Sequence, residues 1–179
     1  MRKSKIAASL ALLTVLSISV TSCMSGMKGG MMKPPFGSPK DVSQANDLWS
    51  RISGYRTWQS YPGMSGFQKG RSPHGKYLKY YVNTIAAQDP LAPGAIIVKE
   101  NYMGKSEDQL GPVTAMEKIP GYDPADGDWF WVKFNPRGQV MKNPMGMPLA
   151  GKVAKGMKKG CIACHANAGG GDFLFVNDD

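Results

Sequence analysis

The centre of the chain contains the run Ala95-Ile96-Ile97-Val98-Lys99-Glu100-Asn101-Tyr102, whose β-branched and aromatic residues predict a β-strand. Side chains alternate between the two faces of a strand, so Ile97, Lys99 and Asn101 share one face and the intervening residues share the other. Lys99 follows a markedly apolar run. On composition alone, the favoured interpretation is a lysine that reaches past the strand edge to solvent while its stem covers apolar surface.

Further strands are predicted on both sides of this run, at residues 76–83, 113–119 and 128–134, with a shorter one at 173–176. Gly, Pro and Asp separate them, and residues 121–127 predict a tight turn between two of them. Consecutive strands that are joined by short turns pair antiparallel.

Helices are predicted at both ends of this sheet. Residues 40–58 have helical periodicity, Ser38 or Asp41 can cap the helix, and Gly54 would end or kink it. Its apolar face would consist of Val42, Ala45, Leu48, Trp49 and Ile52. A second helix is expected near residues 151–166. The expected fold class is therefore α+β: a mainly antiparallel sheet with flanking helices, of which the C-terminal one carries a Cys-x-x-Cys-His motif.

That motif, Cys161-Ile162-Ala163-Cys164-His165, has the spacing that attaches c-type haem. Cys161 and Cys164 would form the two thioether bonds, and His165 would be the axial iron ligand. A zinc site would need a second pair of ligands, and only His74 and Cys23 remain among the cysteines and histidines. A thioredoxin-type dithiol would need a preceding strand, whereas residues 151–160 before this motif are small, basic and compatible with a helix. The predicted cofactor is one covalent haem c.

The N-terminus predicts export. Residues 1–22 combine a basic start with an apolar run, which is typical of a signal peptide, and Val20-Thr21-Ser22-Cys23 resembles a bacterial lipobox. We expect Cys23 to be lipidated and to anchor a periplasmic protein to a membrane. The alternative is a plain secretory signal that leaves Cys23 as an idle thiol. Residues 23–39 would then be a flexible tether, and residues 40–179 the haem domain.

The charge of the chain is mildly basic. Loss of Arg2, Lys3 and Lys5 with residues 1–22 would lower the net charge from +9 to +6. Several lysines crowd toward the haem motif, where they could steer an acidic redox partner, although a solvated face is the favoured interpretation. They are Lys142, Lys152, Lys155, Lys158 and Lys159. Nothing in the sequence resembles a nucleic-acid-binding module.

Several runs together resemble the cytochrome P-460 family, in that family's order. They are Val98-Lys99-Glu100, residues 113–118, Gly121-Tyr122-Asp123-Pro124, residues 127–131 and the terminal haem motif. The resemblance extends over residues 58–176. It implies an antiparallel sheet with flanking helices, a homodimer, and a five-coordinate haem with an open distal site.

The resemblance also implies site residues. In hydroxylamine-oxidising members a lysine is bonded to a haem meso carbon, and Lys99 matches that lysine. These members use a distal carboxylate as a proton relay. Here the aligned strand offers Thr114, with Glu117 as the nearest acid, and both are candidate distal residues.

The expected function is oxidation of hydroxylamine, with handling of nitric oxide, to nitrous oxide, and with electrons passing to an external acceptor such as another cytochrome. One alternative is a nitric-oxide-binding protein of the cytochrome c′-beta type. Another is a simple electron carrier with a methionine from Met141, Met145 or Met147 as sixth ligand. His74 could be a distal ligand or a propionate partner, but a turn residue without a catalytic role is favoured.

Overall fold

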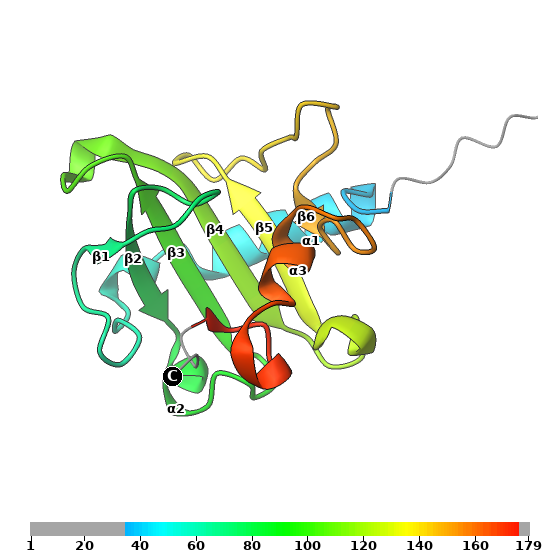
Figure 1. The fold of residues 1–179 in the computed structure, drawn as a ribbon, viewed down its shortest axis with the longest axis horizontal. Helices are drawn as coiled ribbons and strands as arrows, with labels where there is room; N and C mark the ends of the chain where they lie inside the picture. Colours follow the sequence, from blue (N-terminus) through cyan, green and yellow to red (C-terminus); the bar gives the residue numbers. More distant parts are fainter. Residues whose placement is uncertain (1–34, 176–179) are drawn as a thin grey trace, which may run out of the picture. The chain divides into compact units, whose positions relative to one another are not determined.

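A six-stranded sheet organises the described part of the chain, with the strands in the spatial order β1 to β6 and every neighbouring pair antiparallel. The computed structural model describes residues 35–175, which all belong to one unit, Met32–Asp179 (Figure 1). The strands are β1 Gln68–Lys69, β2 Tyr77–Val82, β3 Ile96–Tyr102, β4 Leu110–Lys118, β5 Trp129–Phe134 and β6 Ala150–Gly151. The predicted α+β class and antiparallel sheet are confirmed.

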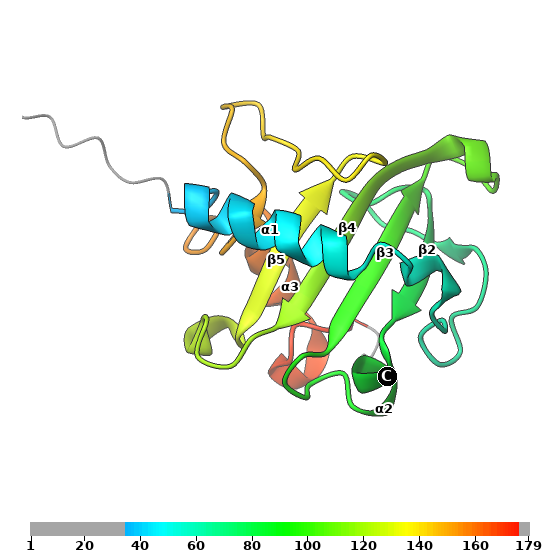
Figure 2. The same cartoon turned by 180° about the vertical axis from the view of Figure 1, so that it is seen from behind.

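Helices lie on both faces of this sheet. The longest, α1 (Pro39–Arg51), crosses the face seen in Figure 2, and α3 (Cys161–His165) lies on the opposite face, seen in Figure 1. The remaining helices are short: α2 Thr84–Gln88 and the 3-10 turns η1 Tyr55–Thr57, η2 Glu107–Gln109, η3 Pro124–Asp126 and η4 Gly169–Gly171. None of the helices that the structure describes is long and apolar enough to cross a membrane.

Helix α1 begins where its capping residues predict. The Ser38 hydroxyl accepts a hydrogen bond from the Asp41 backbone N–H at 3.2 Å, and the Asp41 carboxylate accepts one from the Ser38 backbone N–H at 3.0 Å. Both expected caps therefore act together as a capping box. The helix ends at Arg51, earlier than the predicted residue 58, and η1 follows.

Alternation along the strands divides the core into two layers. Ile96, Val98, Phe130 and other residues of one sheet face pack against Ala45, Leu48 and Ile52 of α1. Ile97, Met116, Trp129 and Trp131 point to the other face and pack with Ile162 of α3. Burial of these apolar side chains supplies the main stabilisation of the fold.

The predicted helix over residues 151–166 is wrong for most of its length. Only Cys161–His165 is helical, and residues 152–160 form a series of turns. Gly151, Ala154, Gly156 and Gly160 have positive φ angles of 92°, 65°, 70° and 135°, which interrupt a right-handed helix. The strand predicted at residues 173–176 is also absent from its described part, because Gly169–Gly171 and the residues after it are irregular.

The predicted boundary between tether and domain is also wrong. Phe36 is buried in the core with 3% of its surface exposed, and the Gly37 N–H donates to the carbonyl of Ala150 at 2.9 Å. The domain therefore includes at least residues 35–39. The expected signal peptide, the lipidated Cys23 and the rest of the tether lie outside the described residues.

Candidate functional site

A cavity of about 290 Å³ lies between α3, the sheet face opposite α1, and the loop that precedes β2. Helix α3 contributes Cys161, Cys164 and His165, so the whole predicted haem-attachment motif lines one wall. Residues 73–75 of the loop form part of the lining, as do residues of β3, β4 and β5. The lining is mainly apolar, as is usual for a cofactor site.

A row of residues that pair across neighbouring strands runs over the sheet face that forms one wall of this cavity. Tyr80 pairs with Lys99, Lys99 with Thr114, and Thr114 with Lys133, one residue each from β2, β3, β4 and β5. The last three of these residues line the cavity, so Lys99 lies on the face that strand alternation predicts. Its ammonium group is 5.4 Å from the centroid of the Tyr80 ring. Lys99 therefore faces the same cavity as the thiols instead of reaching solvent at a strand edge.

Burial lowers the pKa of Lys99 to about 8, although the nearby Cys161 and Cys164 act in the opposite direction. The neutral form of this amine, which is the nucleophilic one, is therefore much more populated at neutral pH than in an exposed lysine. Burial also raises the pKa of the Cys161 thiol to about 11. The thiol of Cys161 is consequently protonated at neutral pH.

The loop before α3 approaches the helix closely at Gly160. A Cβ atom built on Gly160 would lie 2.1 Å from the Cβ of Ala154, and the φ angle of Gly160 is 135°. Glycine is thus required where the chain enters the cysteine motif. The Gly160 carbonyl then accepts a hydrogen bond from the Cys164 N–H at 3.0 Å, which starts the helical turn that positions both thiols.

His165 has the hydrogen bonding of a metal ligand. Its Nδ1 lies 2.7 Å from the carbonyl oxygen of Phe173, and because a carbonyl can only accept, Nδ1 carries the proton. The Nε2 atom is then left with a free lone pair, in the arrangement that metal-ligating histidines use. Burial, followed by the positive charge of Lys99, lowers the pKa of His165 to about 3, so the ring is neutral at pH 7.

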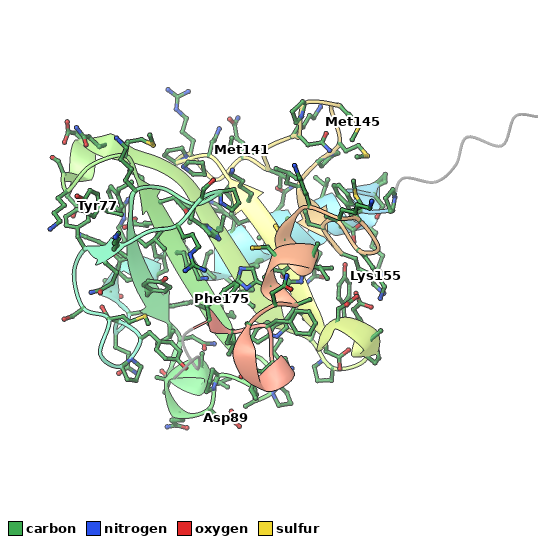
Figure 3. The ribbon with its side chains drawn as sticks, viewed as in Figure 1. Tyr77, Asp89, Met141, Met145, Lys155 and Phe175 are labelled. Atoms are coloured by element: carbon green, nitrogen blue, oxygen red, sulfur yellow. The ribbon has the colours of Figure 1, made fainter. Side chains whose placement is uncertain are left out.

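Trp131 supplies an unsatisfied polar atom beside this ring. Its indole centroid is 4.7 Å from that of His165, and its buried Nε1–H has no hydrogen-bond partner within residues 35–175. Phe175 approaches the same imidazole with a centroid distance of 5.2 Å, and it lies in front of the sheet beside α3 (Figure 3). Hydrophobic alternation alone would mark Trp131 only as an inward-facing residue, because it does not distinguish a cavity wall from a solid core.

His74 lines the cavity from a turn and is partly buried. It comes from the loop between β1 and β2, and its Nδ1 is 2.8 Å from Oδ1 of Asn101. Burial, and then the charge of Lys99, lowers its pKa to about 4. His74 closes a turn with Arg71, as the favoured sequence interpretation expects, and its ring also lies in the cavity. No periodic pattern marks a residue between Pro73 and Gly75, so sequence periodicity alone does not place the ring there.

The two candidate distal residues have different locations. Thr114 lines the cavity, but Glu117 lies on the α1 face of the sheet, where its carboxylate is 2.8 Å from Nη2 of Arg51. Alternation along β4 forces this difference, because residues 114 and 117 have opposite parity. Within the described residues no Asp or Glu side chain lines the cavity, so the expectation of Glu117 as a distal acid is corrected.

The methionines considered as sixth ligands also lie elsewhere. Met141, Met145 and Met147 do not line the cavity, and Met145 is 70% exposed on a loop that extends away from the sheet (Figure 3). Met103 and Met116 line the cavity instead. Met116 belongs to β4, and Met103 follows the end of β3. No sequence pattern predicts that these two methionines lie near the haem motif.

The residues present fit a covalently attached haem. Two thiols and a histidine with a free Nε2 line one cavity. The Trp131 indole N–H also lies there without a hydrogen-bond acceptor among the described residues. Among residues 35–175, two lysines and no carboxylate line the cavity, and their positive charge suits the anionic propionates of a porphyrin. Among residues 35–175, no group of three or more His, Cys, Asp or Glu side chains could hold a metal ion without a porphyrin.

Comparison with known proteins agrees with this geometry. The family model described as Cytochrome P460 matches residues 52–176, which include β1 to β6, the cavity and the cysteine motif. No curated protein matches the chain.

Proposed function

The chain belongs to the cytochrome P460 family, whose members carry a covalently bound haem c, and we propose that this c-type cytochrome oxidises hydroxylamine to nitrous oxide in the cavity beside α3. The observation that carries the proposal is the position of Lys99. Its side chain lines the cavity that the haem-binding thiols line, and its pKa is lowered to about 8. A lysine in this position matches the one that is bonded to haem in hydroxylamine-oxidising relatives.

The overall reaction balances without any further reactant except an electron acceptor. Two molecules of hydroxylamine give one nitrous oxide, one water, four protons and four electrons. The haem iron would supply a coordination position for the hydroxylamine nitrogen and a centre that accepts electrons. The electrons would leave to an external acceptor, for which another cytochrome is the chemical class that we propose.

The side chains of the cavity have separate roles in this proposal. His165 would hold the iron through Nε2, because its Nδ1 is fixed on the Phe173 carbonyl. Lys99 would contact the porphyrin edge from the sheet. The Thr114 hydroxyl lies next to Lys99 in the row across the sheet and would pass protons to and from substrate, since no carboxylate of the described residues lines the cavity.

The experiment is a product analysis of the purified holoprotein under anaerobic conditions. We expect ¹⁵N-hydroxylamine to give ¹⁵N₂O, with four one-electron equivalents of a dye acceptor reduced for each molecule of nitrous oxide. A haem-loaded protein that reduces no acceptor and forms no nitrous oxide would overturn the proposal. The same protein without the dye is the control, because the reaction then lacks a destination for its electrons.

A second candidate function is the binding of nitric oxide. The observation that favours it is the mainly apolar lining of the cavity, which can accommodate a small neutral ligand. Among the described residues the lining has no carboxylate to act as the distal proton relay. This candidate predicts a stable nitric oxide complex together with no turnover of hydroxylamine. The two functions are therefore separated by the same product analysis.

A further inference from the structure

The side chains that line the cavity offer few strong hydrogen-bond acceptors. Within the described part of the chain the lining has no carboxylate, its lysines are donors when charged, and its sulfur atoms are weak acceptors. His165 donates its Nδ1–H to the Phe173 carbonyl and would use its Nε2 for the iron. The side chains that remain as acceptors are those of Asn101, Thr114 and His74.

The oxygen atoms of Asn101 and Thr114 are already engaged. The Asn101 amide nitrogen donates to the carbonyls of Pro112 at 2.7 Å and Lys99 at 3.1 Å, which fixes the orientation of the amide. Its Oδ1 therefore faces His74 and accepts from Nδ1 at 2.8 Å. The Thr114 hydroxyl lies 3.4 Å from the same amide nitrogen and 3.5 Å from the Lys99 carbonyl, so it takes part in the same network.

The bond to Asn101 determines which nitrogen of His74 is free. Because Oδ1 of Asn101 can only accept, the proton of the imidazole is on Nδ1 and the lone pair is on Nε2. No residue in the range 35–175 forms a hydrogen bond with Nε2, and this atom is not among the enclosed ones. His74 thus presents an accessible lone pair from a ring that lines the cavity.

His74 lies on a different wall of the cavity from the residues that would hold the haem. Cys161, Cys164 and His165 belong to α3, whereas His74 belongs to the loop between β1 and β2. The ring centroids of His74 and His165 are 6.2 Å apart, so His74 is close to the iron ligand. A small molecule in the iron position opposite His165 meets the walls that α3 does not form, and His74 belongs to one of them.

The tautomer of His74 decides which small molecules this ring favours. A lone pair accepts hydrogen bonds and donates none. Hydroxylamine carries N–H and O–H groups that can donate to Nε2, whereas nitric oxide has no hydrogen atom. The ring therefore offers a hydrogen bond to the first molecule and none to the second.

We propose that His74 determines the ligand specificity of the cavity, by accepting a hydrogen bond at Nε2 from hydroxylamine and so favouring it over nitric oxide. The inference rests on the proposed function, whose substrate it concerns, and leaves the iron position opposite His165 open. It assigns His74 to binding the substrate, and it separates the two candidate functions by a single side chain.

The loop that carries His74 is held against the end of β3. A Cβ atom on Gly75 would lie 2.4 Å from the Tyr102 carbonyl oxygen, so only glycine allows this approach. The His74 N–H also donates to the Arg71 carbonyl at 2.9 Å. Backbone and ring are thus both fixed, the ring through Asn101 of the same strand, as a residue that selects ligands requires.

The test compares two dissociation constants of the ferric holoprotein, for hydroxylamine and for nitric oxide. Anaerobic stopped-flow absorbance of the haem, without an electron acceptor, measures both. We expect His74→Leu to weaken hydroxylamine binding about three- to tenfold, because one hydrogen bond is lost. Its affinity for nitric oxide should stay within about twofold of the wild type.

Two amide variants provide a matched pair that keeps the position polar. The amide of His74→Gln reaches about as far as Nε2, whereas the amide of His74→Asn reaches only about as far as Nδ1. We expect His74→Gln to retain most of the affinity for hydroxylamine and His74→Asn to lose it as His74→Leu does. If His74→Leu yields no haem protein, this pair decides the matter.

Lys76→Ala is the control, since Lys76 is an exposed residue of the same loop that does not line this cavity. It should bind both molecules as the wild type does. An unchanged affinity of His74→Leu for hydroxylamine would overturn the inference. Equal weakening of both molecules would also overturn it, because the substitution would then have disturbed the cavity as a whole, and so would equal affinities of the two amide variants.

Failure of this inference is distinguishable from failure of the proposed function. A protein that forms nitrous oxide, but whose affinity for hydroxylamine does not depend on His74, would reject the role of His74 and leave hydroxylamine oxidation intact. A protein that forms no nitrous oxide, but loses its preference for hydroxylamine in His74→Leu, would have the opposite meaning.

Discussion

The Lys99 side chain shares its cavity with one other lysine. Both Lys99 and Lys133 belong to the row that crosses β2 to β5, and Thr114 separates them. Burial lowers the pKa of Lys99 to about 8. Lys133 lines the same cavity from β5, so its substitution offers a matched comparison for substitutions of Lys99.

We predict that Lys99 forms a third covalent attachment to the haem. Joining the Lys99 nitrogen to a porphyrin meso carbon removes one hydrogen from each, so a two-electron oxidant such as hydrogen peroxide must be consumed. After protease digestion, mass spectrometry should find the Lys99 peptide linked to the haem peptide of Cys161 and Cys164. Lys99→Arg should abolish this species because a guanidinium remains charged and is a poor nucleophile.

Lys133→Arg is the control for this prediction and should retain the species in which haem joins the Lys99 peptide to the peptide of Cys161 and Cys164. A wild-type protein that yields haem bound only to the cysteine peptide, after treatment with peroxide, would show that Lys99 is not cross-linked. Loss of the cross-link in both variants would indicate a general disturbance of the cavity instead of a specific role for Lys99.

Among the elements, β2, β3 and η1 are joined by the buried carboxylate of Glu100. It accepts hydrogen bonds from the hydroxyls of Tyr55 at 2.6 Å, Tyr102 at 2.6 Å and Tyr81 at 3.0 Å, and from Nε of Arg56 at 2.7 Å. None of its surface is exposed. Glu100 lies next to Lys99 on the strand, so these bonds also fix the part of β3 that positions the lysine.

We predict that Glu100→Gln lowers the free energy of unfolding by about 2 kcal/mol at pH 7, because it removes charge-assisted hydrogen bonds from a buried site. Burial alone would raise the pKa of Glu100, but the bonds from Tyr102, Tyr55 and Arg56 outweigh it, and the net pKa is lowered. A lowered pKa stabilises the fold above the unfolded value of about 4.3, and this contribution is lost as the pH falls through the folded value.

Urea unfolding at a series of pH values measures this effect. The difference between wild type and Glu100→Gln should be largest at neutral pH and should shrink below about pH 4.3. Asp47→Asn is a suitable control, since Asp47 forms an exposed ion pair with Arg51 and should matter little. A difference that stays constant down to acid pH would mean that the charge of Glu100 does not contribute.

The long elements could be predicted from the sequence because their patterns are local. The cap at Ser38 marks the start of α1, and period-two alternation locates β2 to β5 within a few residues. Two-residue strands such as β6 carry no pattern, and the positive φ angles around Gly156 that shorten α3 depend on packing. Likewise, the pairing of Lys99 with Thr114 depends on how β3 and β4 align in the folded sheet. This alignment puts Thr114 on the cavity face and therefore Glu117 on the opposite face.

In the molecule as a whole, ion pairs with acidic side chains neutralise part of the positive charge near the haem motif. Lys152 and Lys155 both contact the Asp123 carboxylate in the turn between β4 and β5, which ties the loop before α3 to that turn. Lys158 and Lys159 are exposed and immediately precede Gly160. Pairing therefore leaves fewer free positive charges near the haem motif than the five lysines of the sequence suggest, and Lys158 and Lys159 are the ones adjacent to α3.

We predict that these lysines accelerate electron transfer to anionic acceptors. Reoxidation of the reduced protein by ferricyanide should slow as salt is raised, because screening weakens the attraction over a Debye length that falls from about 30 Å at 0.01 M to about 10 Å at 0.1 M. At low salt, Lys159→Glu should slow ferricyanide about two- to fivefold and should accelerate a cationic tris-phenanthroline cobalt(III) acceptor. Stopped-flow absorbance of the haem measures both rates. Lys69→Glu makes the same charge change on β1, the strand at the opposite edge of the sheet from β6, and should alter either rate much less. Equal effects of the two substitutions would show that net charge alone, and not the position of Lys159 beside the haem motif, controls the encounter.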